Sequence, residues 1–389
     1  MSSAYYRSPR VVAVVMTIAF ATSLAGAKPL ALIIAPQKQN RRFIVAEYVV
    51  AANPPFSIKD AQTSQSMPCQ WEKTEKGYLV RWVVPFLAAD QAGKYILDES
   101  AAERDSSSAI QPLSLRDDAS GFVAIRSGDS EITRYYYKPA HNKHQKPYFY
   151  PLIVRGVAIT RASPMERKAG EDTDHPHHTS IYFAHGEVNG TDYWSKAPIV
   201  HKRFIEKSAG PVGAHIVAED AWGKDLTETQ DVLIFEAGGD VIMDWTITLT
   251  ADIPVELGKT KEGGFAVRVA QPLVDKSGGR MIDADGNKGE NPIRAHAAVW
   301  ADDYGVIDGK TVGVCIMNHP KSWRFPTNWH VRGYGLFAAN AFFVQGEQRL
   351  AKGESITLKY RLYCHGGDPV EAKVNEVYAG YATPAVVAQ

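Results

Sequence analysis

The sequence contains 389 residues, of which 45% are hydrophobic, and its 43 Lys and Arg residues equal its 43 Asp and Glu residues. A chain with zero formal net charge lacks the positive excess with which proteins bind nucleic acids or anionic membrane surfaces, so we expect neither as a partner. The length suits one large β domain or two domains.

The first 27 residues have the layout of a secretory signal peptide. Arg7 and Arg10 precede an apolar run over 11–24, and Ala25-Gly26-Ala27 forms an A-x-A cleavage site. The run is shorter than the roughly 20 residues that a membrane span requires. We therefore predict an exported protein, periplasmic or extracellular, with no membrane span in the mature chain. An uncleaved N-terminal anchor is the alternative.

Most of the remaining chain has the short-range alternation of β-strands, with many Val, Ile, Thr and Tyr residues. The clearest runs are GYLVRWVVPFL (77–87), GFVAIRSGDSEITRYYY (121–137), VLIFEAGGDVIMDWTITLTADI (232–253) and ESITLKYRLYCHG (354–366). The Gly238-Gly239 pair predicts a hairpin turn, because glycine tolerates positive φ. The best helix candidate lies within 368–381. This balance predicts an all-β sandwich or barrel.

Composition divides the chain into three parts after the signal peptide. We predict a small β module over 38–100, a linker or long loop over the charged, Ser-rich residues 101–120, and a main β-sandwich domain over 121–385. The three cysteines form no C-x-x-C motif, and their pairing stays open. Cys315, in an apolar run, is expected to be a buried thiol.

Four histidines gather in DTDHPHHTSIYFAHG (172–186), which raises the question of a metal site. If residues 177–185 form one strand, alternation places His178 on one face and His177 and His185 on the other. His177 and His185 would then lie about 26 Å apart. A four-histidine cage is therefore not expected, and neither is a cofactor. The compact trio for a divalent metal is Asp174, His175 and His177.

The loop GEVNGTDYW (186–194) suits the recognition of a sugar. Asn189-Gly190 is a strong turn signal. Glu187 and Asn189 can bind hydroxyl groups, and Trp194 can stack on the C–H face of a pyranose ring. The alternative for Trp194 is that it covers the hydrophobic core.

Two later stretches have a similar density of polar and aromatic residues. In KEGGFAVRV, Glu262 precedes two glycines that allow a ligand to approach the backbone, and Arg268 lies on the following strand. The run MNHPKSWRFPTNWHVRGYGLFAANAFF (317–343) contains few aliphatic residues, which is more typical of a binding surface than of a connector. Hydrogen bonds within a structural loop are the alternative there.

These patterns give a set of candidate residues for one site. His178 and His319 are the candidate acid and base, with Glu262 as the partner carboxylate. If two carboxylates perform hydrolysis, Glu187 and Glu262 are the pair. The candidates for substrate binding are Glu187, Asn189, Trp194, Arg268, Asn318, Trp329 and Arg332.

DHPHHTSIYFAHGEVNGTDYW, KEGGFAVRV and the run from WADDYG to FAANAFF resemble a bacterial family named PmoA-like, over residues 120–365. The biochemical role of that family is unassigned, although its label refers to a methane oxygenase. The resemblance implies that the main β-sandwich domain, 121–385, is a PmoA-like domain.

A second resemblance is to the galactose-mutarotase-like supersandwich. It rests on PYFYPLIVRGVAITR (147–161), the His-rich motif after it, and LAKGESITLKYRLYCHGGD (350–368). The resemblance implies a large antiparallel β-sandwich with a sugar-facing concave sheet, on which a His and a Glu act as acid and base. No Glu matches the family's catalytic position near the late strands, so only the sugar-facing sheet carries over.

Three functions remain open from the sequence. The first is a carbohydrate-active enzyme, a hydrolase, lyase or epimerase that uses His and Glu as acid and base. The second is a glycan-binding protein without catalysis, in which Trp194, Trp323 and Trp329 are the stacking platforms. The third is a metal-dependent oxygenase that uses Asp174, His175 and His177.

Overall fold

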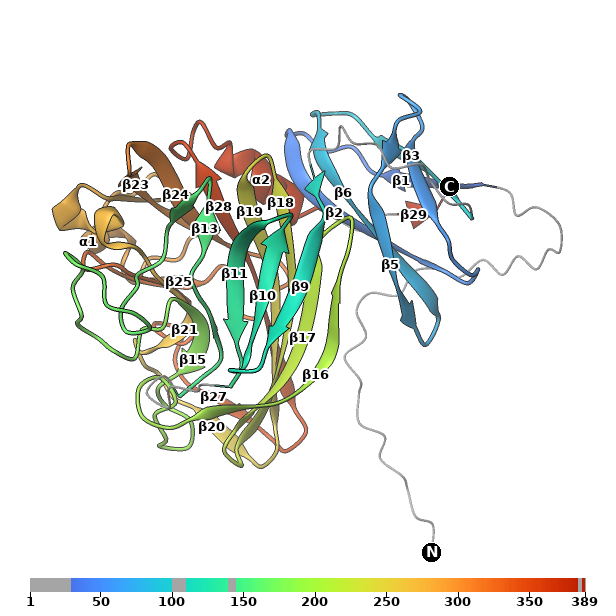
Figure 1. Ribbon diagram of the computed structural model, residues 1–389. Coiled ribbons are helices and arrows are strands. Elements are labelled where there is room, and N and C mark those ends of the chain that lie inside the picture. Colours follow the sequence, from blue (N-terminus) through green and yellow to red (C-terminus); the bar gives the residue numbers. More distant parts are fainter. Residues whose placement is uncertain (1–28, 100–109, 139–144, 384–386, 389) are drawn as a thin grey trace, which may run out of the picture.

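The computed structural model describes residues 29–99, 110–138, 145–383 and 387–388 (Figure 1). The predicted signal peptide lies outside these ranges. Within them, no helix is long and apolar enough to cross a membrane. The described residues form antiparallel sheets and two short α-helices, so the all-β prediction is confirmed.

Two large sheets form the main body of the protein. The first has nine strands: β16 (Ile199–Ala209), β17 (Ala214–Trp222), β18 (Leu226–Ala237), β19 (Asp240–Ala251), β28 (Ser355–Gly366), β24 (Lys310–Asn318), β23 (Trp300–Ile307) and β22 (Arg280–Asp283), with β8 (Ile110–Gln111) paired to β18. The second has eight: β25 (Asn328–Arg332), β26 (Leu336–Asn340), β21 (Gly263–Arg268), β15 (Ile181–His185), β12 (Tyr148–Phe149), β11 (Ser130–Tyr136), β10 (Phe122–Ser127) and β9 (Leu113–Asp118).

The two sheets pack face to face around an aromatic core. Phe265 of the eight-stranded sheet lies 4.8 Å from Trp245 and 5.3 Å from Tyr360 of the nine-stranded sheet, between ring centroids. All three side chains are buried. A large antiparallel β-sandwich is therefore confirmed as the main architecture.

Several predicted elements match the structure closely. Strands β18 and β19 pair from end to end and are joined at Gly238 and Gly239, both with positive φ, as expected for a tight hairpin. Asn189 and Gly190 also have positive φ and connect Val188 to Thr191. Helix α2 (Val374–Tyr381) lies within the predicted helical range.

A small β module precedes the sandwich. It contains two sheets. The five-stranded sheet has the order β29 (Val387–Ala388), β1 (Leu30–Ile34), β7 (Gly93–Asp98), β3 (Ser57–Asp60) and β4 (Ser66–Met67). The three-stranded sheet has the order β2 (Arg41–Val50), β6 (Gly77–Leu87) and β5 (Cys69–Thr74). The module has its own buried core, which includes Trp82 and Tyr95. It is larger than the predicted 38–100, because β1 and the C-terminal β29 join it. The predicted loop over 101–120 is shorter, because residues from Ile110 onward form β8 and β9.

The remaining elements are short. They are α1 (Glu290–Ile293), the 3₁₀ turns Gln271–Leu273 and Asp275–Ser277, and the strand pairs β13 (Ile153–Val154) with β14 (Val157–Ala158) and β20 (Val255–Leu257) with β27 (Gln348–Leu350).

The three cysteines are all free and buried, which confirms the prediction of a buried thiol at Cys315.

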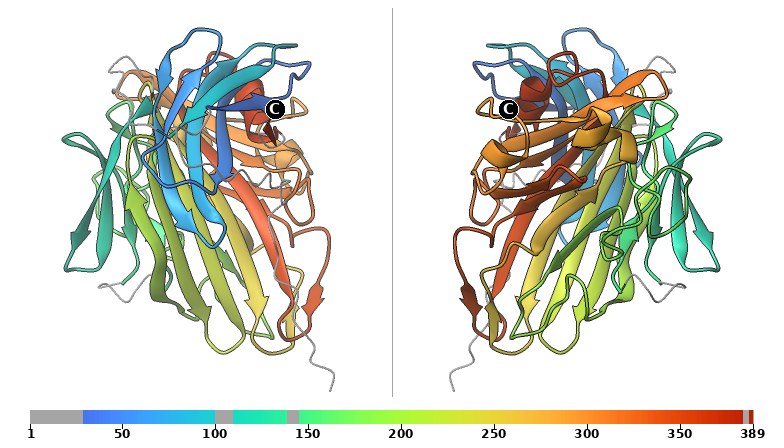
Figure 2. Two further views of the ribbon diagram at one scale, coloured as in Figure 1. Left: turned by 90° about the vertical axis from the view of Figure 1, so that its right-hand side faces the viewer. Right: turned by 90° about the vertical axis from the view of Figure 1, so that its left-hand side faces the viewer.

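The module packs on the outer face of the nine-stranded sheet (Figure 2). Val83 of the module joins a cluster with Phe235 and Tyr363 of that sheet and Val377 of α2. Beside this cluster, hydrogen bonds of His215 connect the module to the nine-stranded sheet. His215 of β17 bonds through Nδ1 to Glu72 of the module at 2.9 Å, and through Nε2 to Asp231 of β18 at 2.8 Å.

We expect this link to make stability depend on pH. Burial alone would lower the pKa of His215, but hydrogen bonds to Asp231 and Glu72 outweigh burial and raise the pKa to about 9. A raised pKa means that the stabilisation is fully present below the unfolded-state pKa, about 6.5, and is lost as pH rises through about 9. At pH 6, the unfolding free energy of the wild-type protein should exceed that of the His215→Gln variant by a few kcal/mol.

Denaturant unfolding of both proteins between pH 6 and pH 10 measures this difference. We expect the difference to shrink steadily toward pH 9, because above about 6.5 the unfolded chain gives up the His215 proton that the folded protein still holds. A difference that stays constant or grows with pH would contradict a charged His215 in the folded protein.

Candidate functional site

The candidate site lies on the outer face of the eight-stranded sheet. Side chains that point away from the core fall in register across four strands: Tyr182 lies opposite Ala266, Ala266 opposite Ala338, and Ala338 opposite His330. Because alternate residues share a face, the next outward row contains Arg268 of β21 and Arg332 of β25. Two alanines between two large rings leave space at the centre of this face.

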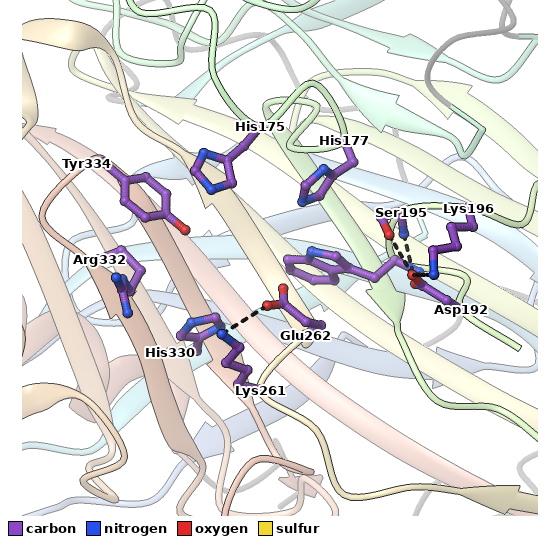
Figure 3. A pocket seen from close by; sticks show the side chains of 11 residues that line it. His175, His177, Asp192, Ser195, Lys196, Lys261, Glu262, His330, Arg332 and Tyr334 are labelled. Atoms are coloured by element: carbon purple, nitrogen blue, oxygen red, sulfur yellow. Dashed lines mark hydrogen bonds and ion pairs between the residues drawn. The ribbon is translucent and has the colours of Figure 1, made fainter. Parts of the chain in front are cut away.

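A cleft of about 370 Å³ opens over this face, within the size range of small-molecule sites (Figure 3). Its walls come from four segments that are far apart in the sequence. The lining residues are His175, His177, Asp192, Trp194, Ser195, Lys196, Lys261, Glu262, His330, Arg332 and Tyr334.

Glu262 is held by the backbone at the start of β21. Gly264 has φ +100, and a Cβ there would lie 2.1 Å from the Ala339 carbonyl oxygen, so only glycine fits. The buried Asn340 amide donates to the Lys261 carbonyl at 3.0 Å and fixes the preceding turn. The Glu262 side chain is 39% exposed, with the Lys261 ammonium 3.6 Å from its carboxylate. The carboxylate points into the cleft (Figure 3).

Asp192, in the opposite wall of the cleft, stabilises the turn that contains Trp194 and Ser195. Its Oδ1 accepts the backbone N–H groups of Trp194 and Ser195, both at 2.9 Å, and its Oδ2 accepts the Ser195 hydroxyl. The buried Lys146 donates to the Trp194 carbonyl at 2.6 Å. Of the two carboxylates that line the cleft, Glu262 is therefore the one that is not used to cap a turn.

The histidine-rich segment is a loop and not a strand. β15 begins at Ile181, and His175 and Ser180 have positive φ, which breaks the alternation predicted for residues 177–185. His175 stacks on Tyr334 with centroids 4.4 Å apart. His177 lines the cleft beside it. The prediction that alternation separates His177 from His178 was wrong, since their rings lie 4.4 Å apart.

Two histidines of the cleft are neutral at pH 7. Burial, with a contribution from the positive charge of Lys146, lowers the pKa of His177 to about 4. Burial and the nearby Arg294 lower the pKa of His330 to about 4. A neutral imidazole can accept a proton from a substrate.

Arg268 and His178 lie behind the cleft wall and do not line it. Arg268 donates through Nη2 to Asp174 at 2.7 Å and through Nη1 to Nδ1 of His178 at 3.2 Å. Both Arg268 and His178 are 1% exposed. The structure therefore places them as supports of the His175–His177 loop, and not at the positions of direct contact that the sequence predicted.

His319 and Asn318 lie away from the cleft. The His319 ring packs 4.9 Å from Tyr381 of α2, and α2 contacts the outer face of the nine-stranded sheet. The Asn318 amide bonds to the carbonyl of Lys359 and to the N–H of Thr327. Both predicted roles are corrected, because β24 runs in the sheet on the other side of the core.

Three further predicted contacts are also corrected. Trp329 is fully buried in the core and donates to the Ala298 carbonyl at 3.2 Å. The Asn189 side chain binds neighbouring segments: it donates to Asp225 at 3.1 Å and accepts the Glu256 backbone N–H at 2.9 Å. Glu187 lies outside the cleft lining and packs over Gly258, so it cannot pair with Glu262 there. Of the predicted binding residues, Trp194 and Arg332 line the cleft.

The proposed metal trio has other partners. Asp174 binds Arg268 and the Nδ1 atom of His175. In the ranges that the structure describes, no group of three or more His, Cys, Asp or Glu side chains is arranged to hold a metal ion.

Several cleft residues were missing from the predicted set: Tyr334, His330, Lys261, Asp192 and Lys196. His330, Arg332 and Tyr334 follow each other at intervals of two in the sequence. That spacing was the available signal for His330 and Arg332, because it places both on the face of β25 opposite to Trp329, whereas Tyr334 lies in the turn after β25.

The model of a family of unknown function, DUF6807, matches residues 122–379. The protein belongs to this family. The matched range contains every residue that lines the cleft, and the match does not show the PmoA-like name. No curated protein matches the chain.

Two solved structures from Enterococcus faecalis resemble the chain. They are a protein in glycosyl hydrolase family 38 (TM-score 0.46, 11% identity) and an alpha-mannosidase from strain V583 (TM-score 0.42, 12% identity). Each match covers 93% of this chain, which spans about half of either structure (47% and 46%).

Proposed function

We propose that this DUF6807 protein acts on a sugar or glycan in the cleft, by general acid–base chemistry. One observation carries the proposal: a single cleft presents the Glu262 carboxylate, the neutral His177 imidazole and the Tyr334 ring. Pyranose recognition uses this combination, because hydroxyl groups bind carboxylates and imidazoles while the C–H face packs on an aromatic ring.

The placement of the groups supports proton transfer. His177 and Glu262 reach into the cleft from opposite walls (Figure 3). A neutral imidazole and a carboxylate on two sides of a bound sugar can remove a proton on one side and deliver one on the other. A hydrolysis by two carboxylates is less well supported, because Asp192 is bound within its own turn.

Tyr334 is the aromatic platform in this proposal. It is half-buried, His175 stacks on its ring, and the guanidinium groups of Arg268 and Arg332 lie 4.9 and 5.5 Å from the ring centre, so the ring edge and the hydroxyl are the parts that it offers to a ligand. Trp194 lines the cleft but is 1% exposed, so it forms part of the wall and offers no open face.

A panel of neutral and acidic oligosaccharides, assayed for binding and for turnover, tests the function. We expect Tyr334→Ala to weaken binding by about ten- to a hundredfold, which corresponds to the loss of one aromatic contact. Trp71→Ala is the control, because Trp71 is 39% exposed but lies on the N-terminal module.

Loss of binding in the Trp71 variant, with normal binding in the Tyr334 variant, would move the sugar site to the module and contradict the proposal. Binding in the cleft without turnover of any oligosaccharide would reduce the proposal to glycan binding.

A further inference from the structure

Buried polar atoms without partners gather beneath the cleft. His178 Nε2, Tyr182 Oη and Trp194 Nε1 are buried and make no hydrogen bond to any described residue. The Trp194 ring lies 5.7 Å from that of His178 and 5.1 Å from that of Tyr182, so the three side chains form one cluster. Buried polar groups in native proteins nearly always bond to protein, water or ligand, so three unpartnered donors side by side are a place where a ligand acceptor can bind.

All three groups can donate a hydrogen bond. Arginine has no acceptor, so the contact between Arg268 Nη1 and His178 Nδ1 requires Nδ1 to be the acceptor. The proton of the neutral His178 ring is then on Nε2. The Trp194 indole is a donor only. Burial raises the pKa of Tyr182 well above its ordinary value, so its hydroxyl keeps its proton.

The surrounding charge is positive. Arg268 lies 2.7 Å and Arg161 lies 3.9 Å from the same oxygen of Asp174, and both guanidinium groups are almost fully buried. Among the described residues, Asp174 is the one carboxylate within ion-pair distance of either arginine. The amine of Lys146 lies 4.7 Å from the centre of the Tyr182 ring, and burial lowers the pKa of Lys146 to about 7. Glu171 and Asp172 add negative charge near Arg161, and a further anion close to the two buried guanidinium groups would be attracted to both.

The cluster faces the cleft. The Tyr182 hydroxyl is within electrostatic reach of Glu262 and Tyr334, which line the cleft. The His178 ring touches His177, and Trp194 itself forms part of the lining. The three donors therefore lie directly behind residues that line the cleft, and a ligand reaches His178 and Tyr182 past His177 and Trp194.

We propose that His178, Tyr182 and Trp194 form a subsite for the carboxylate of an acidic sugar. This inference rests on the proposed carbohydrate function and specifies its substrate class as a glycan that contains uronic acid. A carboxylate supplies lone pairs to three donors and a negative charge to the Arg161–Arg268 pair. A neutral sugar hydroxyl supplies no charge to the Arg161–Arg268 pair.

Calorimetric titration with defined disaccharides tests the subsite. The probes are glucuronate- and galacturonate-containing disaccharides, their carboxyl-reduced neutral counterparts, and a sulfated disaccharide. Tyr182→Phe removes one donor and keeps the ring. We expect it to weaken binding of the acidic disaccharide by about ten- to a hundredfold, with little effect on the neutral one.

Tyr135→Phe is the matched control. Tyr135 is also buried, its hydroxyl also has no partner among the described residues, and its ring packs on Phe149 in the core. We expect this variant to bind the acidic disaccharide as wild type does, which separates the subsite from a general effect of removing a buried hydroxyl.

Each other outcome has a distinct meaning. Equal binding of acidic and neutral disaccharides, or no loss in Tyr182→Phe, would overturn the carboxylate subsite and leave the carbohydrate function standing. Tighter binding of the sulfated disaccharide would overturn the choice of a carboxylate. If wild type binds none of the disaccharides, the proposed function itself fails.

Discussion

Glu262→Gln should lower turnover of the sugar substrate by about 10²- to 10⁴-fold, the usual contribution of a positioned acid or base. The substitution keeps the size of the side chain, replaces one acceptor oxygen by an NH2 donor, and removes the charge and the ability to transfer a proton. The backbone at Glu262 is fixed by Gly264 and Asn340, so the fold should be unaffected. Steady-state kinetics on the substrate found by the oligosaccharide panel measures the effect.

Glu187→Gln is the matched control for this experiment. Glu187 is exposed, lies outside the cleft lining and was the alternative carboxylate on sequence grounds. We expect its turnover to stay within about twofold of wild type, as is usual for surface substitutions. A large loss in Glu187→Gln with normal turnover in Glu262→Gln would contradict the assignment of the carboxylate.

Asp244→Ala should destabilise the folded protein by about 3–5 kcal/mol, because it leaves the buried Arg361 without its anion. Both oxygens of Asp244 bind Arg361, at 2.6 and 2.7 Å, and the Arg361 side chain is 1% exposed. Arg361 also donates to the Phe43 carbonyl of the N-terminal module at 2.8 Å. Denaturant unfolding, with one probe in the module and one in the sandwich, measures the loss.

Glu219→Ala is the comparison for Asp244→Ala. The Arg203–Glu219 pair has the same two-bond geometry, but the Arg203 side chain is 62% exposed. Surface ion pairs contribute about 1 kcal/mol or less. Equal destabilisation by the two substitutions would contradict the view that burial makes the Asp244–Arg361 pair important.

Strand pattern and turn chemistry predicted the main fold. The β18–β19 hairpin could be predicted because two runs of alternating residues flank Gly238-Gly239. The extent of the N-terminal module could not be predicted. The edge strand of its five-stranded sheet is β29, which comes from the C-terminal part of the chain and pairs with β1. No local sequence pattern indicates a pairing between residues so far apart.

Predicting the site depended on which face each strand turns to solvent. Glu262 was predicted correctly as a cleft residue, since a carboxylate beside two glycines indicates a close approach of ligand and backbone. The sequence predicts Trp329 as a contact although it faces the core, because β25 has large or polar side chains on both faces. A shift of one residue exchanges the faces, so composition could not show that His330, Arg332 and Tyr334 face outward.

The positions of buried residues behind the cleft could not be predicted from the sequence either. The sequence predicts His178 as an acid or base, but its contact with Arg268 depends on the loop that precedes β15. The separation of His319 from Glu262 depends on which of two sheets each strand joins. Sequence spacing contains no information on that choice when both sheets are antiparallel and mixed in strand order.

A crystal structure of the protein with a bound uronic-acid-containing disaccharide tests the central claim most directly. We predict that the sugar ring lies against Tyr334, with a hydroxyl or ring oxygen within hydrogen-bond distance of Glu262, and with the carboxylate directed to His178, Tyr182 and Trp194. A disaccharide bound outside this cleft, for example at Trp71 on the N-terminal module, would contradict the account.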